Sequence, residues 1–189
     1  MGLKPEEPPI LILCEGDNDY RFLQGIVKRK LYRLNYRFKD KVIRSIYRDK
    51  GVFTVVEEGK ERLIKNLRIL LSKLRSIRKH LVVVALIDSN YDKPEHITER
   101  LLSSLRSVSE NKAKFPKRKP TVRLESQRGR YHYIIMIEYP TGIHVRLHLI
   151  VIDHSLEYWL DRAKDNPGIL EDSEWYKNLV KLLEEVKLI

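Results

Sequence analysis

The chain has 189 residues, which suits one compact domain, and 42% of them are hydrophobic, so a buried core can form and wholesale disorder is excluded. No apolar run approaches the roughly 18 residues that span a bilayer, and residues 1–9 lack the charged-then-apolar pattern of a signal peptide. The single cysteine, Cys14, excludes an intramolecular disulfide and a cysteine-based zinc site. We therefore expect a cytoplasmic protein that does not associate with membranes.

Positive charge dominates the composition, with 37 Lys and Arg against 26 Asp and Glu and a formal net charge of +11. Such an excess opposes folding through self-repulsion, so a polyanionic partner explains it more economically than solubility does. We expect this partner to be nucleic acid, either DNA or RNA. Abundant Lys, Arg and Glu with only two Gln also resembles the composition of thermophilic proteins, in which charge serves stability.

The first part of the chain predicts strands that alternate with helices. Residues 10–14 (ILILC) form a short apolar run, typical of a strand buried on both faces in a parallel sheet. From Asp19, which we place as the N-cap, apolar residues recur at helical spacing as far as Leu31. A second strand at 42–47 and a helix at 57–78 are expected next.

The strongest strand signal in the chain is LVVVALI, which is also followed by a helical pattern. The remaining elements that we expect are a strand at 81–87, a helix at 95–108, a lysine-rich loop at 111–120, a hairpin of strands at 131–139 and 143–152, a helix from Leu156 that Ser155 caps, and a last helix from Ser173.

Alternating strands and helices predict an α/β fold with a largely parallel central sheet flanked by helices. We expect a domain at 1–160 and a helical extension at 161–189 that packs on the same domain. In sheets of this kind, ligand sites collect just beyond the carboxyl ends of the strands. The residues that follow the two most apolar strands therefore matter most for function.

Acidic side chains stand at both of these places. Glu15 comes directly after the first strand, before Gly16, which we expect to allow a sharp turn. Residues 88–92 (DSNYD) follow the central strand, and an extended backbone there would place alternate oxygen-bearing side chains on one side. Each segment alone is also typical of an ordinary turn. Their joint occurrence after the two strands favours a site for a hard cation, Mg²⁺ or Mn²⁺, held against a phosphate.

These segments resemble the motifs of a known superfamily, the Toprim domains. A Glu15-Gly16 pair after an apolar strand, with Asp19 and then Phe22-Leu23, is similar to the first Toprim motif. The LIDSNYD run at 86–92 is similar to the second motif, an aspartate pair spaced by one residue, and Ser155-Leu156-Glu157 resembles a segment of small and OLD-like Toprim proteins. The resemblance implies a Toprim-like Rossmannoid fold.

Over the matching residues, the resemblance implies that Glu15 is the catalytic acid or base and that Asp88 is the first metal-binding aspartate. The second aspartate of the motif falls on Asn90, a departure that keeps an oxygen ligand but loses its charge, which Asp92 can supply. The implied metal ligands are therefore Glu15, Asp88, Asn90 and Asp92.

A third acidic member of the site is expected near the end of the resemblance, which covers roughly residues 10–160. Glu157 is the candidate, and Asp153 competes with it. Among the histidines, His144 and His148 share one face of a predicted strand, where we expect a structural role rather than a metal pair.

Basic residues concentrate in two segments, 28–50 and 111–130, where Lys and Arg can neutralise phosphates without reading sequence. The residues that we expect to contact nucleic acid are Lys28, Arg29, Arg33, Arg37, Lys117, Arg118, Lys119, Arg128 and Arg130.

The sequence thus leads to two functional hypotheses. The first is a magnesium-dependent enzyme that processes nucleic-acid phosphodiesters, either a nuclease or a Toprim enzyme of DNA repair and recombination. The second is a non-catalytic, nucleic-acid-binding Toprim scaffold that acts with a partner protein. No Walker-type glycine loop occurs here, so an ATPase or repair protein that works with this chain would be a separate chain. The helix from Ser173 is a candidate contact surface for a homodimer.

Overall fold

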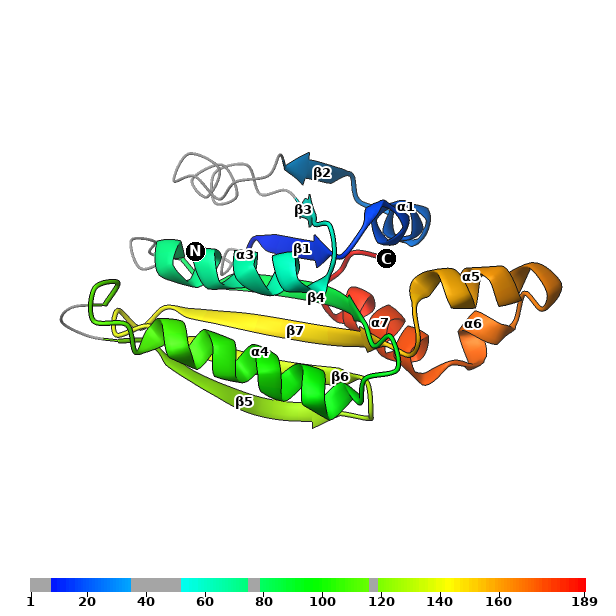
Figure 1. The fold of residues 1–189 in the computed structure, drawn as a ribbon. Coiled ribbons are helices and arrows are strands. Elements are labelled where there is room, and N and C mark those ends of the chain that lie inside the picture. Colours follow the sequence, from blue (N-terminus) through cyan, green and yellow to red (C-terminus); the bar gives the residue numbers. More distant parts are fainter. Residues whose placement is uncertain (1–7, 35–51, 75–78, 116–118) are drawn as a thin grey trace, which may run out of the picture.

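A seven-stranded sheet forms the centre of the molecule, in the order β2-β3-β1-β4-β7-β6-β5 (Figure 1). The computed structural model describes residues 8–34, 52–74, 79–115 and 119–189. The strands are β1 (Ile10–Cys14), β2 (Leu31–Leu34), β3 (Val52–Val56), β4 (Leu81–Asp88), β5 (Thr121–Arg128), β6 (His132–Glu138) and β7 (His144–Ile152).

Most of the sheet is parallel. β1 pairs in parallel with β3 and β4, and β2 and β7 extend this parallel part on its two sides. β6 and β5 continue the sheet in antiparallel pairing. The central strands β1 and β3 are buried along their whole length, as their continuous apolar sequences require. The expected α/β class with a largely parallel sheet is confirmed.

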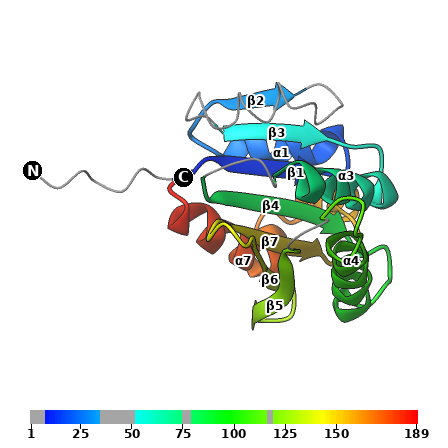
Figure 2. The same cartoon turned by 90° about the vertical axis from the view of Figure 1, so that its left-hand side faces the viewer.

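Helices cover both faces of this sheet. They are α1 (Asp17–Ile26), α3 (Lys60–Lys73), α4 (Pro94–Ser109), α5 (Leu156–Asp165), α6 (Ile169–Asp172) and α7 (Glu174–Glu185). α3 and α4 pack together on one face, and α7 packs against β6 and β7 on the other (Figures 1 and 2). On that second face, the ring of Phe22 in α1 contacts Trp175 of α7, with 6.2 Å between ring centroids.

The last helix belongs to the same hydrophobic core as the sheet. Trp175, Leu179, Leu182 and Leu183 of α7 are buried in one cluster with residues of the central strands. α5 continues without a break across residue 160, where the sequence suggested that the extension begins. In the described parts of the chain, no helix has both the length and the apolar character that crossing a membrane requires.

The strongest sequence signals produced the expected elements, and the weaker ones did not. β1, β4, the β6–β7 hairpin and α4, α5 and α7 confirm the predictions. β2, β3 and β5 were missed, and the helix expected from residue 57 begins only at Lys60, after β3. Leu31 continues a helical spacing but lies in β2, and β5 is an edge strand with mostly exposed side chains, so neither has a clear periodicity. The strand expected at 42–47 lies outside the described residues.

Candidate active site

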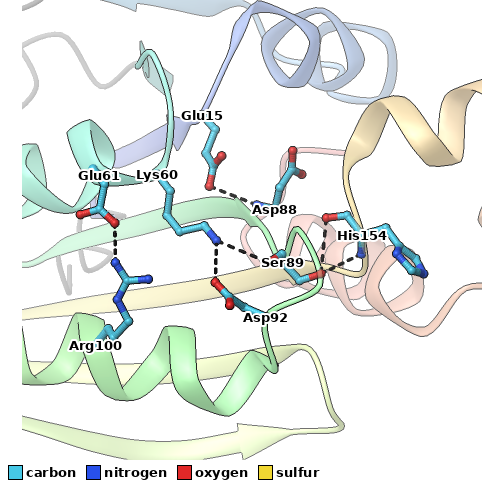
Figure 3. A network of polar contacts seen from close by, with 8 residues as sticks. All are labelled: Glu15, Lys60, Glu61, Asp88, Ser89, Asp92, Arg100 and His154. Atoms are coloured by element: carbon cyan, nitrogen blue, oxygen red, sulfur yellow. Dashed lines mark hydrogen bonds and ion pairs between the residues drawn. The ribbon is translucent and has the colours of Figure 1, made fainter.

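The carboxyl ends of β1 and β4 bring two acidic residues together. Because these strands are parallel neighbours, Glu15 and Asp88 emerge side by side at one edge of the sheet. An Oε1 atom of Glu15 accepts a hydrogen bond from the backbone N–H of Asp88 over 3.2 Å (Figure 3). Two residues 73 positions apart in the sequence are thereby held in direct contact.

Asp19 fixes the backbone that carries Glu15. The expected N-cap role of Asp19 is wrong, because α1 begins at Asp17 with Gly16 as its N-cap. The Asp19 carboxylate reaches back as in a capping box, and its Oδ2 accepts the N–H groups of Glu15 (2.8 Å) and Gly16 (3.1 Å). The expected sharp turn at Gly16 is also wrong, since its backbone is extended (φ −157°, ψ 175°) and does not require glycine. The side chain of Asp19 therefore holds the backbone between β1 and α1 through these two hydrogen bonds.

A third acidic residue reaches the same edge from α5. Oδ1 of Asp88 accepts the backbone N–H of Leu156 (3.2 Å), which ties β4 to the start of this helix. Glu157 follows, and its Oε1 accepts the side-chain amide of Asn18 (2.8 Å). Between the two candidates for a third acid, Glu157 therefore lies beside the Glu15 segment. Asp153 lies near Tyr131 instead: burial, followed by the charge of Asp153, raises the pKa of the Tyr131 hydroxyl.

The segment after Asp88 differs from the expected extended strand end. Asn90 and Tyr91 have positive φ angles of 47° and 72°, and the N–H of Asp92 donates to the carbonyl of Ser89 (2.9 Å), which closes a tight turn. A turn does not align alternate side chains, so the expected row of oxygen ligands does not form. The Asn90 side chain is exposed, and Oδ2 of Asp92 pairs with Nζ of Lys60 at 3.3 Å.

Lys60 is a residue of this edge that sequence reasoning missed. It begins α3, and its side chain is only 13% exposed because it lies over the sheet edge, with Nζ 3.4 Å from the carbonyl oxygen of Ser89 (Figure 3). Gly59 before it has a φ of 97°, a conformation that side chains rarely adopt, and donates its N–H to the carbonyl of Glu15 (2.9 Å). The sequence feature that marks Lys60 is the Gly59-Lys60 pair after β3. This pair points to the carboxyl edge only once β3 is recognised as a neighbour of β1.

The acidic residues of this edge titrate abnormally. Burial, followed by repulsion from Asp88, raises the pKa of Glu15 to about 8. Burial, followed by the charges of Asp19 and Glu157, raises the pKa of Asp88 to about 7. Burial also raises the pKa of Asp19 to about 6, although its two backbone hydrogen bonds act in the opposite direction. Partly buried like charges in one place are typical of sites that bind a cation or move a proton.

The chemistry of these donors fits Mg²⁺, which prefers carboxylate oxygens and usually keeps several waters. Glu15, Asp88 and Glu157 each use one carboxylate oxygen in a hydrogen bond, and in the described part of the chain the other oxygen accepts none. Within those same residues, no three His, Cys, Asp or Glu side chains lie close enough to ligate one ion together. A divalent ion at this edge would therefore be held in part through its waters.

The residues that we expect to contact nucleic acid divide between the two ends of the strands, the carboxyl edge of the sheet and the opposite, amino edge. Arg33 near the end of β2 and Arg128 at the end of β5 lie at the carboxyl edge, on the two outer strands, where they pair with Asp17 (2.8 Å) and Glu185 (2.6 Å). Arg130 follows β5, with its guanidinium over the ring of Tyr131. The remaining described residues, Lys28, Arg29 and Lys119, precede β2 and β5 and so lie at the opposite edge. Arg37, Lys117 and Arg118 lie outside the described residues.

The histidines of β7 have separate partners. His148 pairs with His132 of β6 through ring nitrogens 3.0 Å apart, and both side chains are buried. His144 stacks on His80, with 3.8 Å between ring centroids. The two histidines that share a strand face therefore do not face each other as a metal pair.

A scan against protein-family models finds no match for the chain, and a search of curated proteins finds no significant similarity.

Proposed function

We propose that this chain is a Toprim-like domain that binds nucleic acid and cleaves its phosphodiester bonds with the help of Mg²⁺ or Mn²⁺. The observation that carries the proposal is the contact between Glu15 and Asp88 across the carboxyl ends of two parallel strands. These are the residues to which the motif resemblance assigns proton transfer and metal binding. The net charge of +11 supports a polyanionic substrate.

Each residue of the site has a distinct role in this proposal. Glu15 exchanges a proton with the reacting oxygen, because a carboxyl group with a pKa of about 8 can both donate and accept near neutral pH. Asp88 and Glu157 hold the divalent ion, which supplies charge stabilisation to the phosphate when bound. The ammonium group of Lys60, which pairs with Asp92 in the free protein, exchanges this partner for a phosphate oxygen of the substrate.

The experiment is a cleavage assay of the full chain on single-stranded and double-stranded DNA and RNA, with Mg²⁺, Mn²⁺ or EDTA. We expect cleavage that requires the divalent ion and falls by at least about 100-fold in Glu15→Gln. Nucleic-acid affinity in EDTA should be unchanged in this variant. Glu184→Gln, an exposed position on α7, makes the same chemical change away from the site and should cleave as the wild type does.

Cleavage that survives Glu15→Gln would show that the nuclease activity does not come from this site. A second function, the non-catalytic scaffold, is favoured by one observation: Asn90 stands in place of the second aspartate and its side chain is exposed in a turn. Binding of nucleic acid without turnover under any divalent ion would support that scaffold over the enzyme.

A further inference from the structure

Next to the acidic residues, planar side chains form a row in which Tyr91 and Arg162 are exposed and His154 and Tyr158 are half-buried. The ring of Tyr91, in the turn after β4, contacts the ring of His154 edge to face, with 5.2 Å between centroids. His154 in turn lies 4.5 Å from Tyr158 of α5, and the guanidinium of Arg162 lies 5.3 Å from the Tyr158 ring centroid. Tyr91, His154, Tyr158 and Arg162 are called the aromatic row below.

Hydrogen bonds between two turns hold this row in place. The N–H of Asn90 donates to the carbonyl of His154 (2.8 Å). The N–H of His154 donates to Oγ of Ser89 (2.8 Å), as Figure 3 shows. The turns after β4 and β7 are therefore joined, which keeps the backbone of Tyr91 beside that of His154. Since Asp88 and Glu157 are sequence neighbours of these segments, the aromatic row adjoins the proposed active site.

The conformation of Tyr91 is unfavourable for a residue that only fills a turn. Its side chain is 86% exposed, so packing contributes little, yet its φ of 72° lies in the left-handed region. Tight turns with two positive φ angles favour Asn followed by Gly, and this chain has Tyr at the second position. His154 also has a positive φ, of 61°. Strained backbone of this kind concentrates at functional sites.

We propose that the aromatic row binds unpaired bases of a single nucleic-acid strand by stacking. This inference rests on the proposed function and names its substrate class, a strand whose bases are free to stack. Bases stack on aromatic rings and on guanidinium planes without regard to sequence, because every base has a π-face. Such a strand would lie with its bases on the row and a phosphate beside Lys60. Lys60 is near the row because it pairs with Asp92, the residue that follows Tyr91 in the chain.

The test measures strand affinity by fluorescence anisotropy, using the full chain in EDTA so that no cleavage occurs. The probes are a short labelled oligothymidylate, an abasic strand of the same length and a blunt duplex. We expect the wild type to bind the thymidylate strand about tenfold more tightly than the abasic strand.

Two variants of Tyr91 separate stacking from folding. Tyr91→Gly relieves the positive φ, so it should fold at least as stably as the wild type while losing the preference for the strand with bases. Tyr91→Phe keeps the ring and should keep the preference, and affinity for the duplex should not change in either variant. Tyr32→Ala is the matched control, because this tyrosine is also exposed (46%) but lies on the outer strand β2, against Phe53.

Four outcomes overturn the inference. Equal affinity of the wild type for the thymidylate and abasic strands would show that bases do not stack on the row. The proposed function would then still be tested by the cleavage assay. A preference that survives in Tyr91→Gly, or one that Tyr32→Ala abolishes instead, places the base contacts elsewhere. If the wild type binds none of the probes, the aromatic-row inference is wrong, and the cleavage assay on DNA and RNA decides the proposed function separately.

Discussion

Glu15 and Asp88 are joined by a hydrogen bond of 3.2 Å from the backbone N–H of Asp88 to the Glu15 carboxylate. The contact places two partly buried carboxyl groups on adjoining strand ends. Burial and nearby carboxylates, Asp88 for Glu15 and Asp19 and Glu157 for Asp88, disfavour their charged forms. Their environment therefore disfavours two ionised carboxylates at neutral pH and favours the binding of a cation beside them. Several measurable consequences follow from this and from neighbouring contacts.

The first prediction concerns pH and Mg²⁺. The pKa values of Glu15 and Asp88 are raised from 4.5 and 3.8 to about 8 and 7, so the folded protein keeps protons that the unfolded chain has lost. Their stabilising contribution is complete below about pH 4 and is lost as the pH rises towards 8. A bound Mg²⁺ offsets this loss, so the increase in Tm on adding Mg²⁺ should be larger at pH 8 than at pH 6.

Differential scanning calorimetry with Mg²⁺ or EDTA at the two pH values measures this difference. Asp88→Asn should lose most of the Mg²⁺-dependent increase in Tm, and Glu184→Gln should keep it. An equal increase at both pH values, or one retained in Asp88→Asn, would place the ion elsewhere on the protein.

The second prediction concerns Lys60. Its positive charge lowers the pKa values of both Glu15 and Asp88 against the larger effect of burial, so Lys60→Met should raise both values further. We expect at least about a tenfold loss of cleavage together with a shift of the pH–rate profile towards higher pH. Lys65→Met removes the same charge from an exposed position on the same helix, and an identical profile in both variants would contradict a specific role for Lys60.

The third prediction separates two aspartates at the start of α1. Asp19→Ala leaves the N–H groups of Glu15 and Gly16 without their acceptor and should lower the free energy of unfolding by about 1 to 2 kcal/mol. Asp17→Ala removes only an exposed ion pair with Arg33 and should change it by less than about 0.5 kcal/mol. Urea unfolding of the two variants checks this order, and equal losses would show that the reach of Asp19 to the backbone contributes little.

The fourth prediction concerns acid sensitivity at the buried histidine pair. Burial, followed by the charge of Arg128, lowers the pKa of His132 to about 4, and burial, followed by His132, lowers that of His148 to about 3. The unfolded chain takes up these protons near pH 6.5, so stability is lost as the pH falls below that value, by roughly 1.4 kcal/mol per pH unit for each proton.

The carboxyl groups of Glu15 and Asp88 have the opposite sign in this range, so the test is a difference between proteins. The double variant His132→Leu/His148→Leu removes both partners and leaves neither ring nitrogen unpaired. Its stability should fall less than that of the wild type between pH 6.5 and 4.5 in urea unfolding. Parallel pH profiles would show that the histidines are protonated in the folded protein.

The amino-acid sequence alone determined two strands of the parallel core, β1 and β4, and the acidic residues at their carboxyl ends. Continuous apolar runs predicted β1 and β4, and Glu15 and Asp88 follow them directly, so their place at the strand ends could be inferred without coordinates. This was possible because burial on both faces of a parallel strand leaves a local, unbroken hydrophobic signal.

Only the tertiary structure decided which side chains meet at that edge. Lys60 reaches Asp92 because β3 lies beside β1, and Tyr91 contacts His154 edge to face because the turns after β4 and β7 are hydrogen-bonded to each other. Neither neighbour could be predicted locally, since strand order and positive-φ turns depend on contacts between residues far apart in the chain. Long-range strand pairing and hydrogen bonds between distant turns, not local propensity, therefore determine both contacts.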